Sequence, residues 1–297
     1  MNYNKRIDAA FKNALKITYN DSSKFVFMSD CHRGDGSYAD NFTPNENYYV
    51  AALKYYYNAN FTYIELGDGD DLWETSKIKN ILSQQYHVFE LLNNFYKTNR
   101  FYMLHGNHDV EKGKPNWVKK YMNVCCELNE LCTMPIFKGI EIPESIVLEH
   151  ETRKDEKIYL LHGHQADFFN DRLWKISRFL VHRLWKPLEL IGVKNPTTPA
   201  QKATYKLKIE KSFKQYCKKN NLMLIAGHTH KTSFAMPDEP MYFNDGSCVH
   251  PYHITAIEIE DGKISLVKWV LDSKNDGTLF VKRSIIEGPM KLKQYFR

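Results

Sequence analysis

The sequence predicts an α/β protein, and three observations lead to this fold class. Short apolar runs typical of buried strands alternate with segments in which apolar residues recur at helical spacing. Of the 297 residues, 43% are hydrophobic and 14% are aromatic, which is enough to bury a sizeable core. No run approaches the roughly 18 apolar residues that a membrane-spanning helix needs. Together these observations exclude a mainly disordered chain and a chain that crosses a membrane as a helix.

The first half of the chain is expected to alternate helix and strand. The run KFVFMSD predicts a buried strand, because its apolar residues are continuous and end abruptly in polar ones. Between 77 and 97, apolar residues recur every three or four positions, as on one face of a helix. The expected elements are, in order, a helix over 5–15, a strand over 24–30, a helix over 45–57, a strand over 61–68, a helix over 77–97 and a strand over 100–109.

The second half is expected to contain two long helices and a β-rich tail. Pro196 and Pro199 separate two stretches of helical spacing. Asp261-Gly262, between two apolar runs of the tail, predicts a hairpin turn. The expected elements are short strands within 135–161, helices over 168–190 and 200–219, a strand over 221–230, and tail strands over 241–247, 252–260, 263–271 and 278–286.

Positive charge is concentrated in one internal segment. The net charge of the chain is +6, yet residues 167–219 contain thirteen Lys or Arg and only four Asp or Glu. The segment also carries an apolar face flanked by Lys and Arg, which comprises Leu173, Trp174, Ile176, Phe179, Leu180, Leu184 and Trp185. Such a face either packs on the core with a solvated basic outer side or contacts lipid at a membrane surface.

The cysteines and the N-terminus predict a cytoplasmic protein, with peripheral contact to a membrane left open. The six cysteines form no CxxC pair and no dense framework, as is usual for reduced thiols. The first residues are basic but lack the continuous apolar stretch of a secretory signal. Cys31 is expected to pack in the interior, and the other cysteines are expected to behave as small buried hydrophobic residues.

Five apolar runs end in carboxylate, amide or imidazole side chains. These ends are Asp30-Cys31-His32, Gly67-Asp68-Gly69-Asp70-Asp71, Gly106-Asn107-His108-Asp109, Leu161-His162-Gly163-His164 and Gly227-His228-Thr229-His230. The carboxyl ends of strands in an open α/β sheet meet where ligands bind. In Asp-x-His and His-x-His, both side chains leave the same face of an extended backbone. Because the donors mix oxygen and nitrogen, the pattern favours Mn, Fe, Zn or Co over Ca or Mg.

The order D-x-H, G-D-x-x-D, G-N-H-D, H-G-H and G-H-x-H resembles the calcineurin-like metallophosphoesterases. The resemblance runs from Asp30 to His230 and continues into the β-rich tail. It implies a four-layer α/β/β/α metallophosphoesterase sandwich, with two mixed sheets facing each other and the metal centre at their loop edge. It further implies a single domain over 1–297, with a basic helical cap inserted at 167–220.

The resemblance also implies a ligand set for two divalent metal ions, with manganese expected first and iron, zinc or cobalt as alternatives. One ion would be held by Asp30, His32, Asp68 and His230. The second would be held by Asp68, Asn107, His162 and His228, so that Asp68 bridges the two. His162 and His164 compete for one position. Related enzymes use the histidine directly after the strand, which favours His162 and leaves His164 at the rim as a substrate contact.

The same resemblance implies the catalytic roles. A hydroxide bridging the two metals would attack phosphorus in line, and His108 would protonate the leaving oxygen. Asp71 either orients His108 or caps its own loop, and Asp109 would stand behind the ligands. Arg33 is expected either to contact the substrate phosphate or to lie on the surface. The Asn244-Asp245-Gly246-Ser247 stretch resembles a structural turn near the end of the family's core.

The substrate is less sharply defined. The expected cap and the HGHQAD stretch resemble UDP-2,3-diacylglucosamine pyrophosphatases, although those enzymes commonly have Arg where this chain has His108. Protein Ser/Thr phosphatases have the histidine, but they have Arg where this chain has Leu72. We therefore expect a phosphoester or pyrophosphate hydrolase acting on a phosphorylated small molecule or lipid-linked substrate. The alternatives are a protein phosphatase-like enzyme, a phosphodiesterase acting on nucleotides or nucleic acid, and a non-catalytic metal-binding scaffold.

Overall fold

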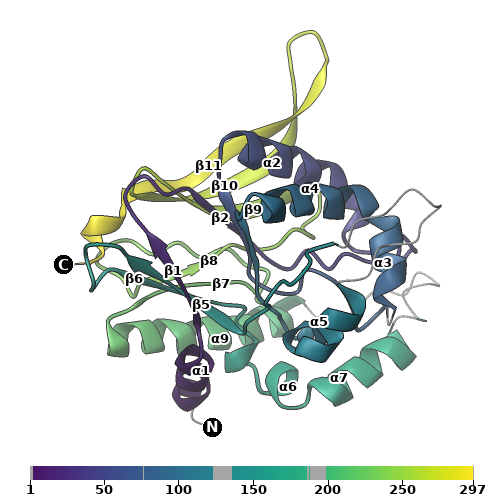
Figure 1. Ribbon diagram of the computed structural model, residues 1–297, viewed down its shortest axis with the longest axis horizontal. Helices are drawn as coiled ribbons and strands as arrows, with labels where there is room; N and C mark the ends of the chain where they lie inside the picture. The colour runs from purple at the N-terminus through teal and green to yellow at the C-terminus, as the bar shows by residue number, and fades with distance from the viewer. Residues whose placement is uncertain (1–2, 76, 123–135, 186, 188–198, 297) are drawn as a thin grey trace.

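The computed structural model describes residues 3–75, 77–122, 136–185, 187 and 199–296, and within them the strands form two sheets that face each other (Figure 1). The five-stranded sheet has the order β1 (Leu15–Tyr19), β5 (Ser145–His150), β6 (Lys157–Leu161), β7 (Met223–Ala226) and β8 (Tyr242–Asn244). The six-stranded sheet has the order β11 (Leu279–Lys291), β10 (Lys263–Ser273), β9 (His253–Glu260), β2 (Phe25–Met28), β3 (Thr62–Glu65) and β4 (Phe101–Met103). Both sheets mix parallel and antiparallel pairs, as the resemblance implied.

Strand β2 shows how the sequence builds the layers. All four of its residues are buried, because one face of the strand meets the other sheet and the opposite face meets helices. Phe25 and Phe27 pack between the sheets with Ile146, Leu148, Ile158 and Leu160 of the facing sheet. Val26 and Met28 point the other way, into the core shared with helix α2. A continuous apolar run is therefore the pattern that a central strand of this sandwich requires.

Helices cover the outer faces of both sheets, which confirms the four-layer α/β/β/α sandwich (Figure 1). Helices α2 (Glu46–Asn58) and α4 (Tyr86–Lys97) pack on the six-stranded sheet. Helices α1 (Tyr3–Lys12) and α9 (Pro199–Asn220) pack on the five-stranded sheet. The remaining helical segments are α3 (Ile78–Gln84), α5 (Pro115–Tyr121), α6 (Phe168–Asp171), α7 (Trp174–Leu180), the π-helical turn η4 (Val181–Trp185), and the 3₁₀ turns η1 (Thr43–Asn45), η2 (Val110–Gly113), η3 (His164–Ala166) and η5 (Leu292–Gln294).

Three helix predictions need correction. The first helix ends at Lys12, and the residues after it form strand β1, which pairs in parallel with β5. The helix expected over 77–97 is two helices, because the backbone of Gln85 leaves the helical region (φ −102°, ψ 24°). The helix expected over 168–190 is also divided, at Leu173 (φ −102°, ψ 18°). Residues 186 and 188–190 of that helix and the proline break at 196–198 lie outside the described residues.

The predicted hairpin at Asp261-Gly262 is confirmed. Glu260 pairs with Lys263 across the turn, and both central residues have positive φ (51° and 63°). Positive φ at both positions is the geometry that matches the twist of the flanking strands, and it favours Asp-Gly. The next hairpin, β10–β11, projects beyond the body of the molecule (Figure 1). Among the described residues, no helix combines the length and the apolar character that crossing a membrane requires.

Candidate metal centre

The polar strand ends of both sheets meet at one edge of the sandwich. Strands β2, β3 and β4 run parallel, so their carboxyl ends lie together, and β6 and β7 bring theirs to the same place. Backbone hydrogen bonds tie the loops to one another: Asp30 N donates to Gly67 O (3.1 Å) and His32 N donates to Asp68 O (2.9 Å). The amide of His108 donates to the Asp68 carboxylate (2.8 Å). Segments far apart in the sequence therefore form one site.

The backbone at the site is strained in a consistent way. Five of the predicted metal ligands have positive φ: Asp30 (50°), His32 (48°), Asp68 (50°), His228 (68°) and His230 (52°). This region is sparsely populated by residues other than glycine and costs on the order of 1–3 kcal/mol for each residue. Such strain persists only where the surroundings determine the conformation, and it is typical of functional sites.

The first group of predicted ligands is Asp30, His32 and His230. Their ligand atoms all lie within 4.8 Å of one another. His230 Nε2 is 3.1 Å from Asp30 Oδ1, and His32 Nε2 is 3.6 Å from the same oxygen. The two Nε2 atoms are 3.3 Å apart. The three ligand atoms are thus close enough together to share one cation.

The second group is Asp68, His162 and His228, whose ligand atoms also lie within 4.8 Å of one another. His162 Nε2 is 3.2 Å from Asp68 Oδ2, and His32 Nε2 is 3.9 Å from that oxygen. Asp68 therefore stands between the two groups, where a bridging ligand would lie. His162 Nδ1 donates to the carbonyl oxygen of Leu66 (2.9 Å), which leaves Nε2 with its lone pair in the neutral ring.

Buried atoms without partners test whether cations fit this site. Asp30 Oδ1, Asn107 Oδ1 and His162 Nε2 are buried and lack any partner with hydrogen-bond geometry. Buried polar atoms are nearly always satisfied, so three of them at one edge need an explanation. All three can act as electron-pair donors, and mixed oxygen and nitrogen donors suit Mn, Fe, Zn or Co. The residues present fit a divalent metal centre.

The electrostatics of the site favour positive charge. Burial alone would raise the pKa of Asp68, but the neighbouring His162 and His108 lower it well below its ordinary value. Burial alone would lower the pKa of His162, but the carboxylates of Asp68 and Asp30 outweigh burial and raise it to about 9. His230 is the exception: although its side chain is 29% exposed, loss of hydration outweighs the attraction of Asp30 and lowers its pKa to about 4. The carboxylates thus attract a cation to the side of His162 that faces Asp68.

His108 lies at the opening of the site and is held from two sides. Its Nδ1 is 3.1 Å from Asp71 Oδ1, and its ring stacks on Trp73 with centroids 4.1 Å apart. Asp71 Oδ1 also accepts backbone N–H groups from Trp73 (3.0 Å) and Glu74 (2.9 Å). Asp71 Oδ2 lies 3.4 Å from His32 Nδ1. One carboxylate therefore contacts His108 and caps its own loop, which combines the two alternatives that the sequence left open.

Arg33 occupies neither of the places that the sequence suggested. Its side chain is fully buried, so it is not a surface residue and does not face a substrate. Its Nη1 and Nη2 donate to the two carboxylate oxygens of Glu65 (2.7 and 2.9 Å), and its Nε donates to Asp70 Oδ1 (2.7 Å). The arginine anchors the loop that carries His32, rather than contacting a phosphate.

His164 is not at the rim either. It is only 3% exposed, and its ring centroid lies 5.6 Å from that of His162. Burial lowers the pKa of His164 well below its ordinary value. Its Nε2 is 3.9 Å from Asp171 Oδ1, too far for a hydrogen bond. The expected substrate contact is therefore corrected to a buried, neutral histidine behind the site.

The sequence interpretation missed two buried charged residues that support the site. Lys112 is fully buried, and its Nζ lies 2.6 Å from Asp70 Oδ2 and 2.8 Å from Asp109 Oδ2. Asp109 in turn accepts the backbone N–H groups of Gly106 (2.7 Å) and Gly69 (3.1 Å). Lys112 thus holds the carboxylate that organises two ligand loops. A lysine in a polar loop gives no sequence signal for burial.

Asp167 is the second omission. It is 2% exposed, and its Oδ2 lies 3.0 Å from His228 Nε2. Its Oδ1 accepts the hydroxyl of Tyr205 on α9 (2.6 Å). Burial alone would raise the pKa of Asp167, but its hydrogen bonds with His228 and Tyr205 lower it to about 2. The HGHQAD stretch contains this residue, but the sequence alone does not show that its carboxylate contacts His228.

Other predicted residues lie where they were expected. Cys31 is buried in the main core, Asn244 is buried at the end of β8, and Asp245 is buried directly after it. Cys217 and Cys248 are also buried, whereas Cys125, Cys126 and Cys132 lie outside the described residues.

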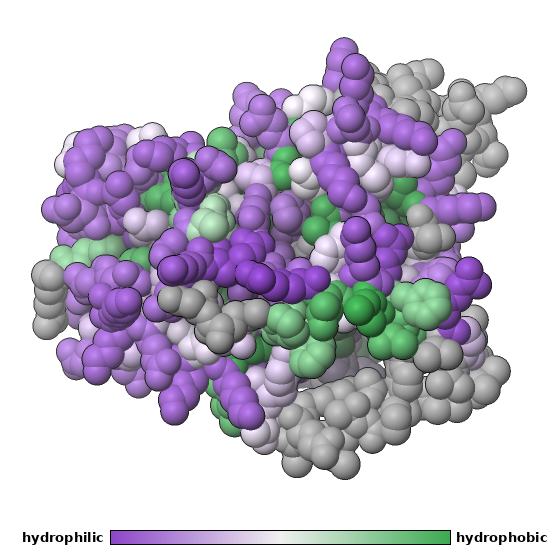
Figure 2. Space-filling view, turned by 90° about the horizontal axis from the view of Figure 1, so that it is seen from below, coloured by the Kyte–Doolittle hydropathy of each residue, from purple (hydrophilic) through white to green (hydrophobic). Residues whose placement is uncertain are grey.

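An exposed apolar patch lies on α6 and α7, which follow the proposed ligand His162 in the sequence. It comprises Phe169, Ile176, Phe179 and Leu180, which are 58%, 56%, 60% and 47% exposed. Figure 2 shows hydrophobic side chains gathered on this lower face of the molecule. Leu173 and Trp174 of the expected face are only partly exposed, and the side chains of Leu184 and Trp185 lie outside the description.

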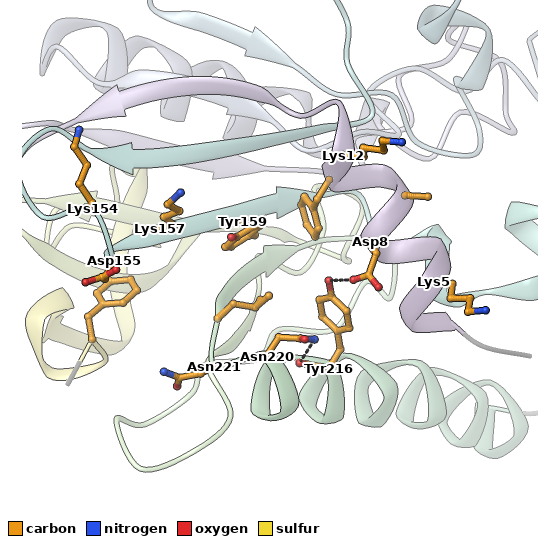
Figure 3. Close-up of a pocket in the computed structure, with 14 residues that line it drawn as sticks. Lys5, Asp8, Lys12, Lys154, Asp155, Lys157, Tyr159, Tyr216, Asn220 and Asn221 are labelled. Atoms are coloured by element: carbon orange, nitrogen blue, oxygen red, sulfur yellow. Dashed lines mark hydrogen bonds between the residues drawn. The ribbon is translucent and has the colours of Figure 1, made fainter.

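A separate groove of about 850 Å³ lies on the outer face of the five-stranded sheet, between α1, β6 and α9 (Figure 3). Four lysines line it: Lys5, Lys12, Lys154 and Lys157. The hydroxyl of Tyr216 donates to Asp8 across one end (2.7 Å). None of the predicted site residues lines this groove, so it is distinct from the metal centre.

The comparison with protein-family models agrees with the geometry. The family model described as calcineurin-like phosphoesterase matches residues 23–232, which is more than half of the chain. Among solved structures, the chain is similar to Vps29 of Chaetomium thermophilum, with 12% identity and a TM-score of 0.36. That similarity covers 89% of this chain and 97% of the other. Among curated proteins, no sequence matches this chain.

Proposed function

The chain belongs to the calcineurin-like phosphoesterase family and is a metal-dependent phosphoester hydrolase, and from this premise we propose that it hydrolyses a small or lipid-linked phosphoester or pyrophosphate. The observation that carries the proposal is the set of buried, unpartnered donor atoms on Asp30, Asn107 and His162. These atoms come from the ends of three different strands. Asp30 and His162 belong to the two ligand groups, and Asn107 is the further ligand that the resemblance implies.

The proposed ligands divide between two divalent cations. One ion is assigned to Asp30, His32, Asp68 and His230, and the other to Asp68, Asn107, His162 and His228. When bound, two such cations would activate a water molecule for attack on phosphorus and offset charge on the phosphate oxygens. Manganese is the first expectation, and iron, zinc and cobalt are the alternatives for this donor set.

We assign to His108 the role of donating a proton to the leaving oxygen of the substrate. Asp71 holds Nδ1, which leaves Nε2 for the substrate, and the side chain is 19% exposed at the opening. Stacking on Trp73 limits the ring to one plane. A histidine so held can donate a proton in the direction of the departing group, which typically contributes about 10²–10⁴-fold to the rate.

The exposed patch on α6 and α7 supports the lipid-linked class of substrate. Phe179 and Ile176 are more than half exposed, and Arg172 and Lys175 are exposed beside them. Apolar side chains next to basic ones suit an acyl chain together with a phosphate, or the surface of an anionic membrane. The segment 167–220 is proposed to act as the cap that brings such a substrate to the metal centre.

Leu72 weighs against the protein phosphatase alternative. It is 2% exposed and packs in the main hydrophobic core, at the position where protein Ser/Thr phosphatases carry Arg. An apolar core residue offers no cation to a phosphorylated side chain. The phosphodiesterase alternative keeps one supporting feature, since Lys208, Lys211 and Lys218 of α9 are exposed.

Hydrolysis of two chromogenic substrates tests the proposal. Chelator-stripped protein is assayed with bis-p-nitrophenyl phosphate and with p-nitrophenyl phosphate, with and without Mn²⁺. We expect Mn²⁺-dependent turnover that is lost in Asp68→Asn. The turnover should be kept in Asp238→Asn, the control, which changes an exposed carboxylate that is not among the proposed ligands. The ratio of diester to monoester turnover then directs the search between pyrophosphates or diesters and monoesters. Binding of two metal ions without turnover of any phosphoester would instead support the scaffold alternative.

A further inference from the structure

One buried carboxylate joins the cap to the metal centre. Asp167 lies at the start of α6, where its Oδ1 accepts the backbone N–H groups of Phe169 (3.1 Å) and Asn170 (3.2 Å). The same oxygen accepts the hydroxyl of Tyr205 on α9. Its Oδ2 faces His228 Nε2 on the loop after β7. The two oxygens therefore have different roles. Oδ1 accepts donors from the cap helices, whereas Oδ2 faces a proposed metal ligand and also accepts the side-chain amide of Asn170 in α6 (2.8 Å).

The contact fixes which nitrogen of His228 is free. Every other group around the Asp167 carboxylate is a donor, so the carboxylate accepts, and His228 Nε2 must carry the proton. His228 Nδ1 then has the lone pair and is available to a cation. His228 is itself held by its backbone N–H, which donates to Asp30 Oδ2 (2.7 Å).

We propose that Asp167 is a positioning residue that couples the cap to the metal centre: it sets the tautomer of His228, and through Tyr205 it makes the order of α6 and α9 depend on metal binding. The inference rests on the proposed metal centre. Coupling of this kind is reciprocal, so a cation that fixes His228 also stabilises the cap helices, and ordered cap helices favour the cation.

Two substitutions separate the two halves of the coupling. In Asp167→Asn the remaining oxygen can keep the cap contacts of Oδ1, while the amide nitrogen places a second donor against His228 Nε2. The Asn170 amide, which donates to Oδ2 in the unmodified protein, can rotate to present its oxygen to that nitrogen. His228 then favours the other tautomer, which blocks Nδ1. In Tyr205→Phe only the bond from α9 is lost, and the contact between Asp167 and His228 remains.

The test measures Mn²⁺ affinity by calorimetry and backbone hydrogen exchange of α6 and α9 with and without Mn²⁺. In the unmodified protein we expect Mn²⁺ to slow exchange in both helices. In Asp167→Asn we expect one of the two ions to bind about 10–100-fold more weakly, and Mn²⁺ to slow exchange in neither helix. In Tyr205→Phe we expect affinity within about threefold of the unmodified protein and loss of the Mn²⁺ effect in α9 alone. The unfolding temperature of the chelator-stripped variants controls for damage to the fold.

The outcomes distinguish failure of the inference from failure of the proposed function. If the unmodified protein binds no Mn²⁺, Zn²⁺ or Co²⁺, the proposed metal centre is wrong. If it binds two ions and Asp167→Asn binds both with unchanged affinity, the metal centre stands and the positioning role of Asp167 is overturned. If Mn²⁺ still slows exchange in α9 of Tyr205→Phe, the link through Tyr205 is overturned.

Discussion

His162 Nε2 faces Asp68 Oδ2 at 3.2 Å, while the opposite ring nitrogen of His162 is committed to the carbonyl oxygen of Leu66. In a neutral ring, this arrangement sets a lone pair against a carboxylate, which is favourable only if a proton or a metal ion lies between them. The pair thus defines a position where positive charge is needed. Several measurable properties depend on what occupies that position.

Replacing Asp68 by Asn tests the bridging assignment. The substitution keeps the shape of the side chain and one acceptor for the amide of His108, but it removes the charge shared by the two ligand groups. We expect bound metal per chain to fall by at least one equivalent and Mn²⁺-dependent turnover to fall at least about 100-fold. Metal content after dialysis is read by atomic spectroscopy. Two tightly bound ions in this variant would contradict the bridging role.

Replacing His108 by Gln tests proton donation. We expect kcat to fall about 10²–10⁴-fold for an alkyl phosphoester, whose leaving oxygen needs a proton, and far less for a p-nitrophenyl ester. Asp71→Asn, which removes the charge facing His108 Nδ1, should give a smaller loss with the same dependence on the leaving group. Equal losses for good and poor leaving groups would assign His108 to binding instead.

The stability of the metal-free protein is expected to depend on pH through His162. In the folded protein the pKa of His162 is raised from an ordinary value near 6.5 to about 9. Its contribution to the free energy of unfolding is therefore complete below about pH 6.5 and is lost as pH rises through about 9. The shift corresponds to at most about 3 kcal/mol of unfolding free energy across this window. Urea unfolding in chelator, from pH 6 to 9.5, measures the loss. His162→Gln should reduce the loss but not abolish it, because the pKa of His32 is also raised well above its ordinary value, where burial is outweighed by Asp30 and Asp71. An equally steep decline in that variant would show that His162 does not contribute.

Replacing Lys112 by Met tests the buried charges beneath the site. The substitution leaves Asp70 with only Arg33, and it leaves Asp109 with backbone donors alone. Removing one member of a buried ion pair typically costs about 3–5 kcal/mol of unfolding free energy. Urea unfolding at neutral pH is compared with that of Lys119→Met, an exposed lysine on α5. A loss no larger than in this control would show that the buried carboxylates are satisfied without Lys112.

The exposed patch on α6 and α7 gives a prediction about the substrate. Replacing Phe179 by Asp should lower kcat/KM about tenfold or more for a lipid-linked phosphoester, because the apolar surface that would hold the acyl chain is disrupted. Turnover of bis-p-nitrophenyl phosphate should change little. Leu271→Asp, on the projecting hairpin, is the matched control. A parallel fall in both activities would mean that the patch serves the fold rather than the substrate.

The sandwich and the position of the site could be predicted because both leave local marks in the sequence. Apolar runs that end in Asp, Asn or His mark strands whose carboxyl ends face a ligand, and Asp261-Gly262 marks a turn by its backbone requirement alone. The position of Arg33 could not be predicted, because its burial depends on Glu65 at the end of β3 and on Asp70 in the loop that follows. The burial of Lys112 likewise depends on Asp70, which lies on another loop.

The same limit explains His164 and the helix boundaries that were placed wrongly. His164 follows a polar motif, but whether it reaches the rim depends on how α6 and its neighbours cover the site. The breaks at Gln85 and Leu173 fall within uninterrupted helical spacing, so the sequence shows no stop signal there. Tertiary packing decides such boundaries.

The positive φ angles of the proposed ligands affect the outcome of directed evolution for thermal stability. At His230, which is 29% exposed and has φ of 52°, glycine would adopt the observed backbone without strain. A screen that selects for heat resistance in a chelating buffer would therefore favour substitutions that remove metal ligands. The selected variants would be more stable to heat but would lack metal-dependent activity. Directed evolution of this chain needs metal in every round, so that occupancy of the site counts toward survival.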